Sequence, residues 1–88
     1  MLDPPSTRLV TRSIRAWNIY PTANEEQIPE GIVPVGEPIT IERVSAIEVL
    51  LWTHVNSETM ALVCWRDALY LVREDDLETG TIRVVRSN

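Results

Sequence analysis

The chain has 88 residues, with eight basic and thirteen acidic side chains, a formal net charge of −5 and one cysteine. A chain of this length forms one domain with a small core, and a single cysteine excludes an internal disulfide. The negative charge argues against a protein that binds nucleic acid mainly by neutralising phosphates. The first residues do not resemble a secretion signal or a membrane anchor, so we expect a cytoplasmic protein.

Charge is unevenly distributed along the chain. All eight basic residues are arginines, and those nearest the two ends are Arg8, Arg12, Arg15, Arg83 and Arg86. The middle of the chain is strongly acidic. We therefore expect any basic patch to involve the first and last strands.

The N-terminal part begins with an irregular arm. Residues 1–7 contain Pro4-Pro5 and predict a flexible arm, so residues 8–88 are assigned to one domain. Residues 8–20 mix β-forming side chains with three arginines, which is typical of an edge strand.

Residues 21–38 predict a long irregular loop. This stretch holds four of the six prolines, two glycines and four glutamates, and proline excludes a continuous helix. A long loop inside a compact domain is usually functional or well packed. The short Ile32-Val33 run can attach it to the core.

The following residues predict strands. Residues 37–44 alternate in polarity, with Ile39 and Ile41 inward. Residues 47–73 are the most apolar stretch, and polar breaks at 56–59 and 66–67 predict a three-strand meander. Residues 73–78 predict a charged turn or a single helical turn, and residues 81–86 predict a last strand.

Strand alternation predicts two apolar faces on the meander. In its first strand, one face carries Ile47, Val49, Leu51, Thr53 and Val55, and the other carries Glu48, Leu50, Trp52 and His54. Over the whole meander, one parity set contains Leu50, Trp52, Val63, Trp65, Leu69 and Leu71, and the opposite set contains Leu51, Leu62 and Tyr70. A small domain has one interior, so the second face needs cover from the 21–38 loop or from another subunit. We favour self-association or a permanent partner over a free monomer.

This order of elements resembles the SH3-like domain. The segment 15–20 is similar to the Ala-Leu-Tyr-Asp-Tyr strand of SH3 domains, 24–28 to their acidic RT loop, 35–41 to their diverging turn, and 68–77 to their last strand and 3₁₀ turn. The resemblance implies a mainly β fold, a small barrel of five to six antiparallel strands with a short 3₁₀ turn. Residues 72–76 lack the Pro and Tyr of signalling SH3 domains, so the chain looks closer to bacterial variants.

No catalytic or metal-binding set is predicted. His54 is the only histidine, and a hairpin about 56–59 places it near Thr59, away from Cys64, so a Cys/His nucleophile pair fails. Cys64 is interpreted as a buried small hydrophobe. The acidic run 74–78 lacks the ligand spacing of a calcium loop. We therefore expect no enzyme activity, no metal and no cofactor.

The leading functional hypothesis is a non-catalytic protein-interaction module, either a small regulatory or accessory protein or a subunit, whose partner is unspecified. Aromatic side chains are the usual anchors of interfaces. The candidate surface lies between the 21–38 loop and the 52–59 hairpin and contains Tyr20, Glu25, Glu26, Glu30 and Trp52. The alternative for Tyr20 and Trp52 is a place in the core.

A second hypothesis is a nucleic-acid-associated SH3-like protein. If the first and last strands pair, Arg8, Arg12, Arg15, Arg83 and Arg86 gather on one side of the domain. A segregated basic patch can bind phosphate despite a negative total charge. Strand alternation splits these arginines over two faces, so this hypothesis ranks second.

Overall fold

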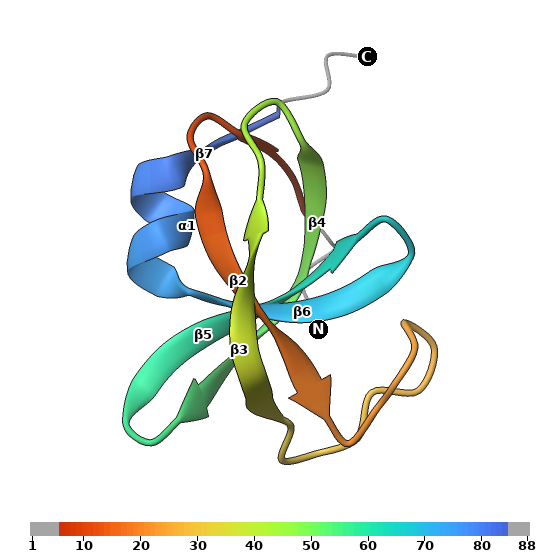
Figure 1. Cartoon of the computed structure of the whole chain (residues 1–88). Coiled ribbons are helices and arrows are strands. Elements are labelled where there is room, and N and C mark those ends of the chain that lie inside the picture. The colour runs from red at the N-terminus through yellow and green to blue at the C-terminus, as the bar shows by residue number, and fades with distance from the viewer. Residues whose placement is uncertain (1–5, 85–88) are drawn as a thin grey trace.

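The computed structural model describes residues 6–84 as one twisted antiparallel sheet with a short helix (Figure 1). The elements are β1 (Ser6–Val10), β2 (Ile14–Tyr20), β3 (Val33–Ile41), β4 (Ala46–Val55), β5 (Glu58–Trp65), β6 (Ala68–Arg73), α1 (Glu74–Gly80) and β7 (Thr81–Arg83). The strand order is β3-β2-β6-β5-β4-β1-β7. The mainly β prediction is confirmed. The prediction of a closed barrel of five to six strands is wrong, because seven strands form an open sheet with β3 and β7 at its edges.

The N-terminal part forms two strands where one was predicted. Thr11 and Arg12 donate their backbone N–H groups to the Gly80 carbonyl, and the chain turns there between β1 and β2. The arm predicted over residues 1–7 ends sooner, because Ser6 and Thr7 already pair with β4. Residues 1–5 lie outside the described residues.

The central meander is confirmed as β4, β5 and β6. The two hairpin turns are Asn56-Ser57 and Arg66-Asp67, and all four residues have φ values between 50° and 66°. Positive φ at both central positions matches the twist of the flanking strands. The first turn is shorter than the predicted 56–59, because residues 58 and 59 belong to β5.

A β-bulge at Leu50 overturns the predicted faces of β4. Val49 pairs with Val63, but Leu51 pairs with Leu62, so one extra residue lies between the two pairs. An extra residue exchanges the faces of all residues beyond it. Ile47 and Val49 therefore share a face with Trp52, whereas Leu51 and Val55 lie on the opposite face.

The two-residue turn between β5 and β6 overturns a second part of the face assignment. Val63 pairs with Tyr70 and Leu62 pairs with Leu71. Directly paired residues lie on the same face. Val63 and Leu71 therefore lie on opposite faces, although their numbers have the same parity.

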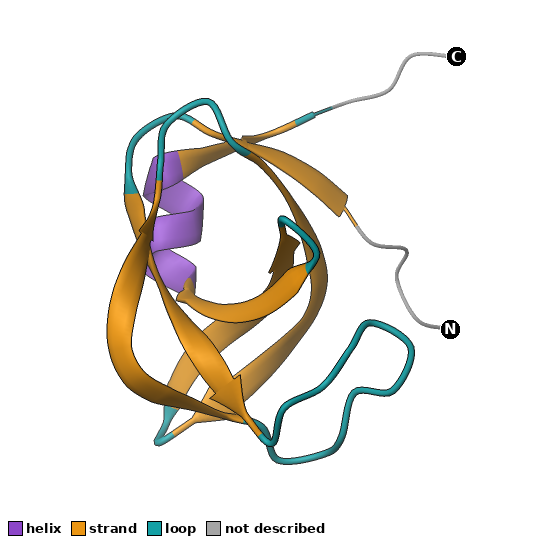
Figure 2. Cartoon of the chain, turned by 45° about the vertical axis from the view of Figure 1, so that its right-hand side comes forward, coloured by secondary structure: helices purple, strands orange, loops and turns teal. Residues whose placement is uncertain are grey.

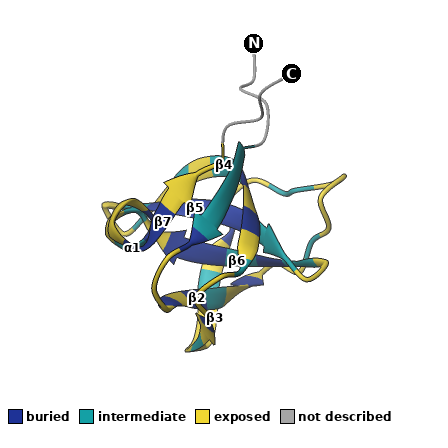
Figure 3. Cartoon of the chain, turned by 90° about the horizontal axis from the view of Figure 1, so that it is seen from above, coloured by how far each residue is buried: buried dark blue, intermediate teal, exposed yellow. Residues whose placement is uncertain are grey.

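Two apolar clusters occupy the two faces of the sheet. The inner cluster contains Val10, Ile14, Ala16, Ile41, Ile47, Val49, Ala61, Val63, Val72 and Leu77. The outer cluster contains Ile19, Ile32, Met60, Leu62, Leu69 and Leu71. Figure 3 shows the buried bands running through the strands, while much of α1 is exposed. The sheet coils, so strands β1 to β6 and the helix all contribute to the inner cluster.

The loop of residues 21–32 is the long teal loop beside the sheet in Figure 2, and its side chains cover part of the outer cluster. Its Ile32 is 4% exposed, and Ala23 and Ile28 pack against the same cluster. The prediction of two apolar faces is confirmed, and this loop supplies part of the cover for the second. Self-association stays a prediction.

The remaining elements differ from the prediction mainly in their ends. β3 begins at Val33 and passes Gly36 at φ 72° where a turn before residue 37 was predicted, and Ile41 points inward as predicted. The charged turn or single helical turn predicted at 73–78 is an α-helix that extends to Gly80, and it takes the place of the 3₁₀ turn that the resemblance implied. β7 is shorter than the predicted 81–86, and residues 85 and 86 lie outside the described residues.

Candidate functional site

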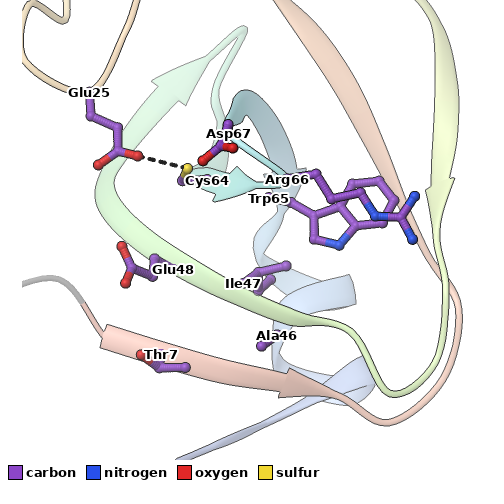
Figure 4. A pocket seen from close by; sticks show the side chains of 9 residues that line it. All are labelled: Thr7, Glu25, Ala46, Ile47, Glu48, Cys64, Trp65, Arg66 and Asp67. Carbon is purple, nitrogen blue, oxygen red and sulfur yellow. Dashed lines mark hydrogen bonds between the residues drawn. The ribbon is translucent and has the colours of Figure 1, made fainter.

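The acidic loop is held in shape by its own asparagine. Asn24 Oδ1 accepts hydrogen bonds from the backbone N–H groups of Glu26 and Gln27, each at 3.0 Å. This side-chain turn is a common use of asparagine in loops. It places Glu25 beside β5, where Glu25 Oε1 accepts a hydrogen bond from Cys64 Sγ at 3.0 Å (Figure 4).

Cys64 packs against the outer cluster but is only half-buried and is hydrogen-bonded, so its prediction as a buried small hydrophobe is confirmed only in part. The pKa of Cys64 is raised from 9.0 to about 11. Burial is the largest cause, followed by the hydrogen bond to Glu25 and by the negative charges of Glu25, Glu48 and Asp67. The side chain is therefore a protonated thiol at neutral pH, and a thiol is a poor nucleophile.

A shallow depression of about 400 Å³ lies next to this contact. It is lined by Thr7, Glu25, Ala46, Ile47, Glu48, Cys64, Trp65, Arg66 and Asp67. Figure 4 shows the Arg66 guanidinium over the Trp65 ring, 4.5 Å from the ring centroid. Trp65 also contacts Tyr70, with ring centroids 6.0 Å apart. The aromatic surface in the depression is thus already covered by a cation of the same chain.

His54 lies where the hairpin prediction placed it. It pairs with Thr59, and its Nδ1 lies 3.2 Å from Thr59 Oγ1. Cys64 lies five residues beyond Thr59 on β5 and pairs with Glu48, on the other side of the β4 bulge from His54. The predicted separation of His54 and Cys64 is therefore confirmed. Residues 6–84 hold no group of three or more His, Cys, Asp and Glu side chains arranged for a metal ion. Among the same residues, no helix is long and apolar enough to cross a membrane.

The structure separates the residues of the predicted partner surface. Tyr20 is 66% exposed and Trp52 is 45% exposed, so the alternative that both belong to the core is wrong. Trp52 pairs with Ala61 of the inner cluster, whereas Glu25 contacts Cys64 beside the outer cluster. Trp52 and Glu25 therefore lie on opposite faces of the sheet. Glu26 and Glu30 are exposed on the loop.

An exposed apolar strip on β2 and β3 was missed by sequence reasoning. Tyr20 pairs with Val33, and Asn18 pairs with Val35, which puts these side chains on one face. Val33 is 42% exposed and Val35 is 39% exposed. The alternation of Val33 and Val35 was visible in the sequence, but only the strand register places Tyr20 beside them. We call Tyr20, Val33 and Val35 the apolar strip.

The predicted basic patch is brought together only in part. The first and last strands pair as expected, and Arg8 lies opposite Arg83. Arg12 donates a hydrogen bond from Nη2 to Thr79 Oγ1 at 2.6 Å. Arg15 lies on the β2–β3 pair, opposite Thr40, and Arg86 is outside the described residues.

Comparison of the chain with models of protein families, with curated proteins and with solved structures found no match. The geometry of the surface is therefore the basis for assigning a function.

Proposed function

We propose that the protein is a non-catalytic protein-interaction module, a small regulatory or accessory protein or a subunit, and that its partner docks on the apolar strip beside the acidic loop. The observation that carries the proposal is the joint exposure of Tyr20, Val33 and Val35 on one face of β2 and β3. Tyr20 and Val33 are cross-strand neighbours, about 5 Å apart. Val35 follows Val33 on the same face of β3, opposite Asn18, and extends this apolar surface along the strand.

The strip faces away from the core. Ile19 and Pro34 form the intervening pair, and Ile19 belongs to the outer cluster under the loop. Tyr20 and Val33 on the opposite side of the strands thus have no cover among residues 6–84. An exposed Tyr beside aliphatic side chains is the kind of anchor on which interfaces depend.

The charge around the strip indicates the chemistry of the partner. Residues 21–38 contain four glutamates and no Lys or Arg. Glu26 and Glu30 are exposed on the loop that leads from Tyr20 to Val33. A partner that presents an apolar ridge flanked by Lys or Arg matches both properties.

The edge of β3 favours docking through side chains over the addition of a strand. Pro34 and Pro38 lack a backbone N–H group, and Gly36 lies at an irregularity in the pairing with β2. Prolines and bulges on an edge strand hinder pairing with another chain. We therefore place the contact on the exposed face of the strip.

Two further parts of the proposal rest on sequence patterns. The order of acidic loop, three-strand meander and helical turn supports an SH3-like domain. A reduced thiol at Cys64 and the lack of a second cysteine support a cytoplasmic location.

In-cell photo-crosslinking tests the proposed surface. Benzoylphenylalanine placed at Val35 should form an adduct with a partner, whereas the same group at Val44, which is 70% exposed elsewhere, should not. The adduct should be lost in a Tyr20→Ser/Val33→Thr variant and in a Glu26→Lys/Glu30→Lys variant. The matched controls are Val44→Thr for exposed apolar area and Asp75→Lys for charge.

A separate Trp52→Ala variant tests whether Trp52 contributes to the same contact. We expect the adduct formed through benzoylphenylalanine at position 35 to persist in this variant. Circular dichroism establishes that each variant is folded. If the folded Tyr20→Ser/Val33→Thr variant keeps the wild-type adduct, the proposed surface is wrong.

A further inference from the structure

Within residues 6–84, the outer face of the sheet is exposed around the pairing of β4, β1 and β7. In this part, Leu9 lies between Ala46 and Ile82 in the strand register. Ile82 is 54% exposed, and Val84, one step beyond it on the same face, is 46% exposed. The loop of residues 21–32 packs on the outer cluster, which β2, β5 and β6 supply. The terminal strands are thus left with exposed apolar side chains.

Among residues 6–84, β7 is also an unpaired edge of the sheet. Gly80 O accepts a hydrogen bond from Thr11 N at 2.8 Å, and Val84 N donates one to Thr7 O at 3.1 Å. In an antiparallel pair, alternate residues bond to the neighbouring strand. The backbone groups of the even-numbered residues therefore face β1, and the N–H and C=O groups of Arg83 face the open side.

The opposite face of this edge carries two arginines without a carboxylate partner. Arg8 pairs with Arg83, and Arg8 Nη1 donates a weak hydrogen bond to Thr81 Oγ1 at 3.4 Å. Within residues 6–84, the one ion pair is formed by Arg73 and Glu58, and the Nε of Arg8 is buried without a hydrogen-bond partner. Burial and the charge of Arg83 lower the pKa of Arg8, and the charge of Glu78 acts in the opposite direction.

We propose that the β7 edge receives an extended segment of a partner protein, which adds to the sheet as an eighth strand. Its backbone bonds to Arg83, its apolar side chains continue the surface of Ile82 and Val84, and its Asp or Glu side chains lie beside Arg83 and Arg8. Strand addition takes its affinity from backbone hydrogen bonds and its specificity from alternate side chains. This surface is separate from the apolar strip, so the inference goes beyond the proposed function.

Charge favours an acidic segment over a second copy of the chain. A twofold pairing of two β7 edges places Arg83 of one copy near Arg83 of the other, and like charges on paired strands are destabilising. Nucleic acid is also less favoured. The described residues of β1 and β7 include no aromatic side chain for stacking on a base. The apolar side chains of Ile82 and Val84 also offer no favourable contact to a phosphate group.

Two labelled peptides test the proposal. One alternates Val and Glu, and the other alternates Val and Lys. Fluorescence anisotropy at low salt should show the wild type binding the Glu peptide about tenfold more tightly than the Lys peptide. Arg83→Glu should reverse this preference, which would identify Arg83 as the residue that selects the charge of the peptide. A Glu peptide with a central Pro should bind weakly, because it cannot complete the backbone pairing.

Location is tested by amide chemical shifts. Binding of the Glu peptide should shift the amides of residues 81–84 and leave those of the 21–32 loop unchanged, and Ile82→Asp should weaken binding. Tyr20→Ser/Val33→Thr should bind the Glu peptide like the wild type, so failure of the proposed function is distinguishable from failure at this edge.

Three results would overturn the inference. The first is equal binding of the Glu and Lys peptides, or a preference that Arg83→Glu does not change. The second is an oligonucleotide that binds the wild type and not Arg83→Glu, while the Glu peptide does not bind. The third is a homodimer in light scattering that Ile82→Asp converts to monomer, which would assign the edge to a second copy.

Discussion

The thiol of Cys64 on β5 donates a hydrogen bond to Oε1 of Glu25 in the acidic loop, across 39 positions of sequence. The contact joins the loop to the sheet at the border of the outer cluster. It also couples the position of the loop to the protonation of one side chain, because only the thiol form of Cys64 can donate.

This coupling predicts a loss of stability at alkaline pH. The pKa of Cys64 is raised to about 11 in the folded protein from an ordinary value of 9.0. The folded state holds the proton more tightly, so the contribution is fully present below pH 9 and is lost as pH rises to about 11. Urea denaturation should show this loss in the wild type and not in Cys64→Ser.

The rate of alkylation by iodoacetamide provides an independent measurement of the same pKa. Its pH midpoint should lie near 11 in the wild type and move to lower pH in Glu25→Gln, because the hydrogen bond and the negative charge are weakened. Glu30→Gln is the control for a loop glutamate without this contact. A wild-type midpoint near pH 9 would contradict the prediction.

Neighbouring residues of the loop should differ sharply in their effect on stability. Ile32 is 4% exposed in the outer cluster, whereas Val33 is 42% exposed. Ile32→Ala should lower the free energy of unfolding by about 2–5 kcal/mol, as for other buried Ile side chains. Val33→Ala should change it by less than about 0.5 kcal/mol. Similar losses in urea denaturation would mean that the loop does not cover the cluster.

Gly80 is predicted to be required by packing, not by backbone conformation. A Cβ atom at Gly80 would overlap Ile14 Cγ2. Overpacking of this kind costs about 1–3 kcal/mol, which exceeds the gain of up to about 1 kcal/mol that Ala brings to a helix. Gly80→Ala should therefore lower the free energy of unfolding.

Ile14→Leu tests the cause of this loss, because leucine has no Cγ2 branch. In a double-mutant cycle, Gly80→Ala should cost less in the Ile14→Leu background. Additive effects would show that Ile14 is not the residue that excludes a side chain at Gly80.

Removing a charge from the β1–β7 pair should stabilise the protein. Arg8 and Arg83 lie opposite each other, and like charges in that position are destabilising. Arg83→Gln should raise the free energy of unfolding by about 0.2–1 kcal/mol at low salt, and the gain should shrink in 1 M salt because screening weakens the repulsion. Arg43→Gln, in the exposed turn after β3, is the control. A lower stability of Arg83→Gln at low salt would be evidence against repulsion.

Several parts of the candidate surfaces were predictable from local sequence. The placement of His54 beside Thr59 followed from a hairpin turn. For Tyr20 and Trp52 the sequence left a place on the surface and a place in the core as alternatives, and the structure shows both side chains exposed. The partner of Cys64 was not predictable, because Glu25 meets it only when the loop packs on β5. The apolar strip was missed for the same reason, since Tyr20 and Val33 become neighbours through the pairing of β2 with β3.

By itself, the sequence determined the mainly β class, the three-strand meander, the irregular acidic loop and the presence of two apolar faces, because alternation and turn residues act over a few neighbouring positions. Only the tertiary structure decided which side chains share a face. A single extra residue at Leu50 exchanges the faces of β4 beyond it, and a two-residue turn sets which residues of β5 and β6 are paired. The tertiary structure also decided that the sheet stays open and that β7 pairs with β1. The β1–β7 pairing joins segments more than 70 positions apart, and it depends on how the whole sheet coils around the inner cluster.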